Sequence, residues 1–235
     1  MKAALEKYFT LPLRDKRKLL DHLETMITEN RKEKFSEILR NRTRHLTIVL
    51  EDIFQPHNAS AVLRTCDCFG IQDVHIIENR NRYEVNPDVA LGSSKWLSIR
   101  KYSRTGDNTE ECLAGLREKG YRIVATTPHK NDHTPETLPV DTPFALVFGT
   151  ELEGLSDTAI SLAGEFVRIP MVGFTESLNI SVSAAIFLRA LTVRMRNAEI
   201  NWRLTEEEAL DVRLEWVMNT LKRPEAIAAE FLAKQ

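Results

Sequence analysis

Glycine is scarce in this chain of 235 residues. There are nine glycines, roughly 4% against a typical ~7%. No two of them are separated by a single residue, and none is followed by lysine. The chain therefore contains neither the G-x-G-x-x-G dinucleotide fingerprint nor a phosphate-binding P-loop. A nucleotide-like cofactor would have to be held by another device.

Cysteine and long apolar runs are also lacking. The three cysteines, Cys66, Cys68 and Cys112, are an odd number without C-x-x-C spacing, so we expect reduced thiols and neither a disulfide nor a zinc site. No apolar run approaches the ~18 residues of a membrane span. The charged residues Lys2, Glu6 and Lys7 also lie within the first seven positions, where a signal peptide would be apolar. These features predict a cytoplasmic protein without a membrane partner.

No single sign of charge dominates the chain. Its formal net charge is -2, so the overall balance does not indicate a nucleic-acid partner. Residues 31–44 are a local exception, with six basic and two acidic side chains. Such a run is commonly a solvated helix face, but the excess of positive charge favours a phosphate-bearing partner.

The hydrophobic pattern divides the chain into a helical, basic N-terminal extension (1–44), a central domain (45–198) and a helical C-terminal extension (199–235). In the central domain, apolar runs predict strands at 46–50, 74–77, 96–99, 121–126, 144–148 and 166–169. Helices are expected between them, including one capped by Asn58 or Ser60 and stopped by Gly70. This alternation predicts an α/β fold with a mostly parallel sheet covered on both faces.

Three polar clusters follow predicted strands, at residues 55–65, 149–155 and 169–179. In open α/β sheets, ligands bind beyond the carboxyl ends of the strands, so the clusters predict a site at that edge. Arg64 stands six residues after Asn58, and we expect both to face one side near the start of their helix. His129 and His133 lie between two prolines, where solvated loop histidines are a better interpretation than a metal pair.

The three clusters resemble the motifs of the SpoU (TrmH-type) branch of the SPOUT RNA methyltransferases. The resemblance runs from about residue 35 to residue 196, with all three motifs in order at strand–loop–helix boundaries. The matching residues are Asn58-x-x-Ala61-x-x-Arg64-Thr65, Phe148-Gly149-x-Glu151-x-x-Gly154, Ile169-Pro170-Met171-x-Gly173 and Ser177-Leu178-Asn179-x-Ser181-x-Ser183-Ala184.

This resemblance implies a SPOUT fold with a deep C-terminal trefoil knot at about 144–196, and a homodimer with its active site near the interface. It implies the cofactor S-adenosyl-L-methionine, bound by Thr126, Gly149, Ile169, Met171 and Leu178. Because a sulfonium is already an activated methyl donor, no metal is implied. The basic helix before the first strand also resembles the family's, which implies RNA contacts by Arg40, Arg42 and Arg44.

The implied reaction is methylation of a ribose 2′-hydroxyl in RNA, with guanosine 18 of the tRNA D-loop favoured. The implied catalytic residues are Arg64, Asn58, Glu151, Ser177 and Asn179. Arg64 would act either as a base or as a charged clamp for a phosphate and the developing alkoxide. A guanidinium is a poor base because it stays protonated, which favours the clamp.

Each of these residues also has a simpler interpretation. Asn58, Ser177 and Asn179 are common helix caps, and Glu151 is a typical solvated loop carboxylate. The alternative functions are methylation of ribosomal RNA and RNA binding by a non-catalytic protein of the same fold. Glu176 departs from the pattern, which usually has glutamine before Ser177, and a carboxylate near RNA is repulsive unless paired.

Overall fold

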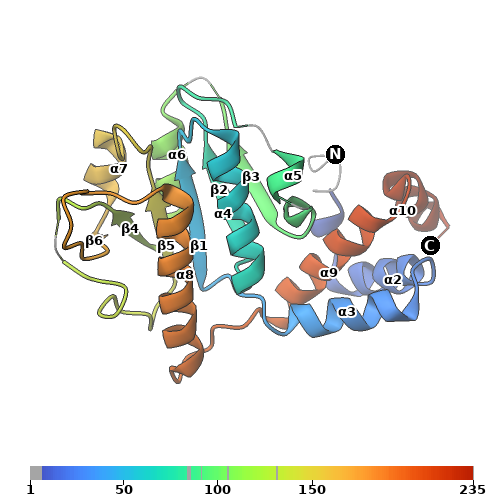
Figure 1. Cartoon of the computed structure of the whole chain (residues 1–235). Coiled ribbons are helices and arrows are strands. Elements are labelled where there is room, and N and C mark those ends of the chain that lie inside the picture. Colours follow the sequence, from blue (N-terminus) through green and yellow to red (C-terminus); the bar gives the residue numbers. More distant parts are fainter. Residues whose placement is uncertain (1–6, 84–85, 91, 105, 131, 235) are drawn as a thin grey trace. The chain divides into compact units, whose positions relative to one another are not determined.

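The computed structural model describes residues 7–83, 86–90, 92–104, 106–130 and 132–234. The chain forms two compact units (Figure 1). The larger unit runs from Thr43 to Trp202. The smaller unit joins the N-terminal part of the chain, up to Arg42, with the C-terminal part from Arg203 onward. Each unit is described on its own below.

The larger unit is built on a parallel sheet. Its strands are β1 (Leu46–Glu51), β2 (Asp73–Ile77), β3 (Ser98–Tyr102), β4 (Arg122–Thr126), β5 (Phe144–Phe148) and β6 (Glu165–Val167). Within the described residues they form one sheet in the order β3-β2-β1-β5-β4-β6, and every neighbouring pair is parallel. The predicted α/β class is confirmed. The sheet is more regular than expected, since all its pairs are parallel.

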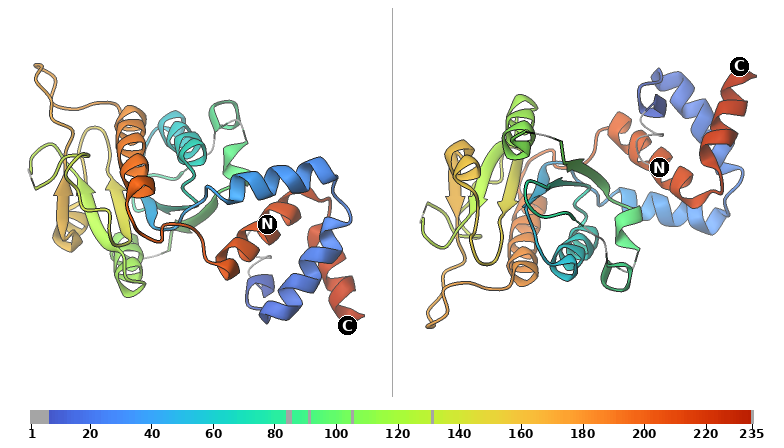
Figure 2. Two further views of the ribbon diagram at one scale, coloured as in Figure 1. Left: turned by 90° about the horizontal axis from the view of Figure 1, so that it is seen from below. Right: turned by 90° about the horizontal axis from the view of Figure 1, so that it is seen from above.

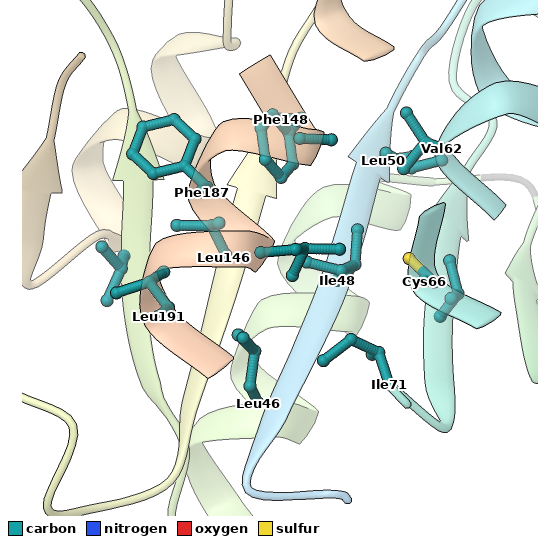
Figure 3. Close-up of a cluster of buried hydrophobic side chains, with 14 of the residues drawn as sticks. Leu46, Ile48, Leu50, Val62, Cys66, Ile71, Leu146, Phe148, Phe187 and Leu191 are labelled. Atoms are coloured by element: carbon teal, nitrogen blue, oxygen red, sulfur yellow. The ribbon is translucent and has the colours of Figure 1, made fainter. Parts of the chain in front are cut away.

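Two long helices cover one face of this sheet. They are α4 (Pro56–Phe69) and α8 (Ile180–Asn197). Figure 3 shows their side chains Val62, Cys66, Phe187 and Leu191 meeting Ile48 and other residues of β1 and β5. The residues of β1 and β5 are buried throughout, as expected for central strands covered on both sides. This shared core fixes the starts of α4 and α8 beside the carboxyl ends of β1 and β5.

The opposite face is covered by α6 (Asn108–Glu118) and α7 (Asp157–Leu162), as the two views in Figure 2 show. Cys112, Leu113 and Leu116 of α6 pack with Val49 and Val147 of the sheet. Two short segments, α5 (Pro87–Ala90) and the 3₁₀ turn η1 (Ser93–Lys95), complete the unit. Within the described residues, no helix is both long and apolar enough to span a membrane.

Two predicted boundaries are wrong. Helix α4 begins at Pro56 after the N-cap Gln55, because proline is well suited to the first helical turn. Asn58 and Ser60 therefore lie inside the helix, where both are buried. The strand expected at 96–99 begins only at Ser98. Trp96 closes the preceding 3₁₀ turn. Strand β3 lies at the sheet edge, and its exposed residues obscure the hydrophobic pattern expected of a strand.

The smaller unit brings together helices from the two ends of the chain. It contains α2 (Leu13–Glu24), α3 (Glu29–Leu39), α9 (Glu206–Thr220) and α10 (Pro224–Ala233). The core between them includes the buried side chains of Leu19, Leu23, Phe35 and Trp216. Lys16, which is almost fully buried, donates a 2.7 Å hydrogen bond to Asp211 Oδ1. The two helical extensions thus form one folded body.

Candidate active site

Hydrogen bonds connect the three sequence motifs through Asn58, Glu151 and Asn179. The side-chain amide of Asn58 donates to Glu151 Oε1 at 2.8 Å. The amide of Asn179 donates to the same Glu151 oxygen at 2.7 Å and to Asn58 Oδ1 at 3.1 Å. One residue comes from α4, one from the loop after β5 and one from the start of α8. We call these three residues the Asn–Glu–Asn network.

The local fold explains why the two asparagines hold their positions. Asn179 is the N-cap of α8, and its Oδ1 accepts hydrogen bonds from the Ser181 amide at 2.9 Å and the Ser181 hydroxyl at 2.6 Å. Its capping role and its place in the network therefore coexist. Asn58 is not a cap. It is 4% exposed and also donates to Gln55 Oε1 at 3.1 Å, so its polar atoms are satisfied within the site.

A tight turn after β5 presents Glu151. Thr150 and Gly154 exchange backbone hydrogen bonds of 2.9 and 3.1 Å, and Gly154 has φ +72°, a conformation that favours glycine. A Cβ atom on Gly149 would lie 2.2 Å from the carbonyl oxygen of Gly154. Both glycines of the second motif are therefore required by the backbone of this turn.

Glu51, which the sequence analysis did not single out, anchors the far side of the same loop. It is 2% exposed at the end of β1. Its carboxylate accepts from the Ser156 amide at 2.9 Å, the Ser156 hydroxyl at 2.6 Å and the Thr109 hydroxyl at 2.5 Å. A carboxylate at the end of an otherwise apolar strand was the available signal, because a buried charge needs such partners.

A cavity of about 480 Å³ lies beside the network. All five predicted cofactor residues line it, namely Thr126, Gly149, Ile169, Met171 and Leu178, together with the predicted catalytic residues Glu151 and Ser177. Thr126 Oγ1 donates to Val147 O at 2.8 Å, which ties β4 to β5 at the cavity wall. Residues from three loops thus converge on one hollow.

The loop between β6 and α8 forms one side of this cavity. Residues 170–179 are exposed throughout, and the loop extends away from the sheet (Figure 2). Val172 and Phe174 are fully exposed, whereas Met171 and Leu178 are 36% and 37% exposed. Met171, Glu176, Ser177 and Leu178 line the cavity, so an exposed loop forms this side of the wall.

Arg64 lies outside this cavity. Its exposed side chain lines a separate groove between α4 and α8, of about 1000 Å³, together with His57, Ser181 and Arg189. Within the described residues, no hydrogen bond joins Arg64 to the Asn–Glu–Asn network. The expectation that Asn58 and Arg64 share one side of the helix is wrong. Six residues span about 600° of helical rotation, which leaves the two side chains roughly 120° apart around the helix.

The three predicted RNA-binding arginines have different surroundings. Arg40 is exposed. Arg42 is 1% exposed, and its guanidinium carbon lies 5.2 Å from the centre of a ring of Trp216. The prediction of an RNA contact by Arg42 is therefore wrong, because its side chain is buried. Arg44 is partly buried and pairs with Asp73, with Nε 3.1 Å from Oδ2. Local charge alone could not separate the exposed arginine from those used by the fold.

The histidines outside the motifs occupy different sites. His129 lines the cavity, whereas His133 Nε2 lies 3.4 Å from Glu165 Oε2. Among the described residues, no group of histidine, cysteine and carboxylate side chains has the arrangement of a metal site. His75 is buried, and its burial lowers the pKa of the imidazole to about 3.

Comparisons with known proteins agree with this geometry. A model of the SpoU rRNA methylase family matches residues 45–189. A tRNA (guanosine(18)-2'-O)-methyltransferase of Borreliella burgdorferi is 42% identical over 200 residues, covering 85% of this chain and 90% of that protein. The enzyme of the same name from Thermus thermophilus is 35% identical over 161 residues, covering 68% and 81%.

Solved structures show the same likeness. The crystal structure of the A. aeolicus TrmH/SpoU tRNA modifying enzyme has a TM-score of 0.73 and 29% sequence identity. The likeness covers 83% of this chain and 98% of that one. The matched family region contains the sheet, the cavity and the Asn–Glu–Asn network. The chain therefore belongs to the SpoU rRNA methylase family.

Proposed function

We propose that this protein transfers a methyl group from S-adenosylmethionine to the 2′-hydroxyl of guanosine 18 in the D-loop of tRNA. The observation that carries the proposal is the Asn–Glu–Asn network, which joins all three family motifs beside one cavity. The substrate follows from the relatives, which share the name tRNA (guanosine(18)-2'-O)-methyltransferase at up to 42% identity over most of the chain.

The cavity suits S-adenosylmethionine. Its volume of about 480 Å³ falls in the range of small-molecule sites, and its lining combines apolar residues such as Ile169, Leu178 and Phe187 with polar ones such as Thr126 and Ser177. The residues that would hold the cofactor are Thr126, Gly149, Ile169, Met171 and Leu178. When bound, the cofactor supplies a methyl group activated on a sulfonium, so the protein must supply alignment and manage one proton.

Arg64 is the residue we assign to the substrate hydroxyl. A guanidinium stays protonated in proteins, so the exposed side chain of Arg64 would pair with a substrate phosphate and stabilise the alkoxide that develops. As the O–CH₃ bond forms, the S–CH₃ bond of the donor would break to leave S-adenosylhomocysteine, and the proton of the 2′-hydroxyl would leave to solvent. The alternative in which Arg64 takes that proton itself predicts that Arg64→Lys retains substantial rate with a shifted pH profile.

The network positions the loops for this reaction. Glu151, Asn58 and Asn179 hold the turn after β5 against the starts of α4 and α8, and Ser177 lies on the wall of the cavity. Asn179 also fixes Ser181, which lines the groove of Arg64. We assign Asn58, Glu151 and Asn179 to positioning, because their side chains bond one another in this structure.

A second copy of the chain would cover the groove beside Arg64. The α8 face next to it exposes Val182, Ile186 and Val193 at 45%, 38% and 36%, so we propose a homodimer that places Arg64 at the interface. We also propose the family's trefoil knot at about 144–196, because α8 returns from the edge strand β6 to pack on β5. A cytoplasmic location accords with a tRNA substrate.

For the RNA, we propose that Arg40 and the catalytic Arg64 contact phosphates. Both side chains are exposed in the single chain, and phosphate contacts supply affinity without sequence information. Arg42 and Arg44 are left out of this set, since burial and the pair with Asp73 occupy them.

One experiment tests the proposed function and its alternatives. The protein is incubated with labelled S-adenosylmethionine and either total tRNA or ribosomal RNA, and the methylated nucleotide is mapped by nuclease digestion. Label at guanosine 18 of tRNA supports the proposal. Label confined to ribosomal RNA would show that ribosomal RNA, and not tRNA, is the substrate. Cofactor binding without label in any RNA would favour a non-catalytic RNA-binding protein.

A further inference from the structure

Arg168 is a cationic residue of the cavity lining whose buried Nε has no partner among the described residues. Arg168 follows β6 and lines the cavity. Its backbone amide donates to His133 O at 3.0 Å, which holds the residue in place. Its Nε is buried without a hydrogen-bond partner. In the part of the chain that the structure describes, its guanidinium makes neither a hydrogen bond nor an ion pair.

Arg122, on the neighbouring strand β4, is an arginine of the same region whose side chain is paired within the fold. Its Nε donates to Thr142 Oγ1 at 2.8 Å, and its Nη1 donates to both oxygens of Glu165 at 2.6 and 2.7 Å. Its Nη2 donates to Pro139 O at 2.7 Å. Buried polar groups in native proteins are nearly always paired. The unpaired Nε of Arg168 therefore indicates an acceptor that the described residues do not provide.

The acidic side chains of the cavity do not supply that acceptor. Glu151 accepts from Asn58 and Asn179, and Glu153 pairs with Arg80. Glu176 also lines the cavity, but within the described residues no ion pair joins it to Arg168. Lys130, another basic residue that lines the cavity, has its ammonium 3.7 Å from the ring centre of Phe166, so its charge is already accommodated.

We propose that the Arg168 guanidinium holds the carboxylate of the methionyl part of S-adenosylmethionine in this cavity. The inference rests on the proposed function and adds to it a residue that selects the aminocarboxyl group. A planar guanidinium pairs with a carboxylate through two parallel N–H bonds. Arg168 would thereby discriminate the full cofactor from adenosine derivatives that lack the carboxylate.

The test compares two ligands by calorimetry on the purified protein. S-adenosylhomocysteine carries the carboxylate, whereas 5′-methylthioadenosine has the same adenosine and sulfur without it. Arg168→Ala is expected to weaken S-adenosylhomocysteine about tenfold to hundredfold, the range for a charge-assisted pair, and to leave 5′-methylthioadenosine unchanged. The affinity of Arg168→Lys for S-adenosylhomocysteine is expected to lie between those of the unaltered protein and of Arg168→Ala. Lys130→Ala, the matched control on the same cavity, should change neither affinity.

Retained binding of 5′-methylthioadenosine also reports that the variant cavity is folded. Equal weakening of both ligands, or no change in either, would overturn the inference. So would a loss of tRNA affinity and of its salt dependence with S-adenosylhomocysteine binding intact, since Arg168 would then be a phosphate contact. If the unaltered protein binds neither ligand, the proposed function itself fails. If it binds and methylates while Arg168→Ala binds equally well, only the assignment of Arg168 fails.

Discussion

Asn179 and Glu151, which are 28 residues apart in the chain, are joined by a hydrogen bond of 2.7 Å from the Asn179 amide to Glu151 Oε1. One residue begins the helix α8, and the other belongs to the turn after β5. The same oxygen accepts from Asn58 at 2.8 Å. A single carboxylate therefore holds two helix starts against one turn, and its removal affects three segments together.

Glu151→Ala should reduce methylation by about a hundredfold. The variant loses two hydrogen bonds to a charged acceptor and leaves the amide of the buried Asn58 short of a partner, each loss being of the order of 1.5–3 kcal/mol. Initial rates with saturating tRNA and cofactor measure the effect. Glu153→Ala is the control, because the ion pair of Glu153 with Arg80 is exposed and makes a small contribution. Equal losses in the two variants would contradict the network's role.

Gly149→Ala should destabilise the larger unit and weaken binding of S-adenosylhomocysteine. The added Cβ would lie 2.2 Å from Gly154 O and 2.5 Å from Leu155 N, so the turn must move, at about 1–3 kcal/mol. Thermal unfolding and calorimetry measure the two effects. Gly115→Ala, inside helix α6, meets no atom within 4 Å and should raise stability by roughly 0.5–1 kcal/mol. A stable, fully binding Gly149→Ala protein would refute the account of this turn.

His75 should make the folded protein sensitive to acid. Its pKa is lowered from 6.5 to about 3, first by burial and then by Arg100. Below pH 6.5 the unfolded chain therefore binds a proton that the native chain does not, and stability is lost as the pH falls from about 6.5 to about 3. Denaturant titrations of His75→Gln over this range should show a smaller pH slope, by up to one proton.

Ile186→Glu should convert the proposed dimer to a monomer. Ile186 lies on the α8 face beside the Arg64 groove and is 38% exposed, and a buried, unpaired carboxylate would be strongly unfavourable at an interface. Light scattering after size-exclusion chromatography measures the mass. Met26→Glu is matched in exposure, at 44%, and should leave the mass unchanged. A dimer that survives Ile186→Glu would place the interface elsewhere.

The sequence predicted the sheet class and the residues around the cavity, but not their connections. Runs such as Phe144–Phe148 are apolar enough to be recognised as strands, and the motif residues follow them directly. The burial of Arg42 and the partners of Glu51 could not be predicted, because each depends on residues far away in the chain, Trp216 for Arg42 and Ser156 for Glu51. Local sequence patterns indicate hydrophobic periodicity and helix caps, whereas tertiary packing determines these distant partners.

The pairing of N- and C-terminal helices in one unit has a consequence for synthesis. Helix α2 packs on α9 and α10, so its apolar side, which carries Leu19 and Leu23, is fully covered only after those helices have been synthesised. Residues 43–202, which form the other unit, are complete before then. During translation, the apolar side of α2 therefore remains exposed, and accessible to chaperones, until α9 and α10 have been synthesised. A nascent chain that stops before Arg203 would never cover this side.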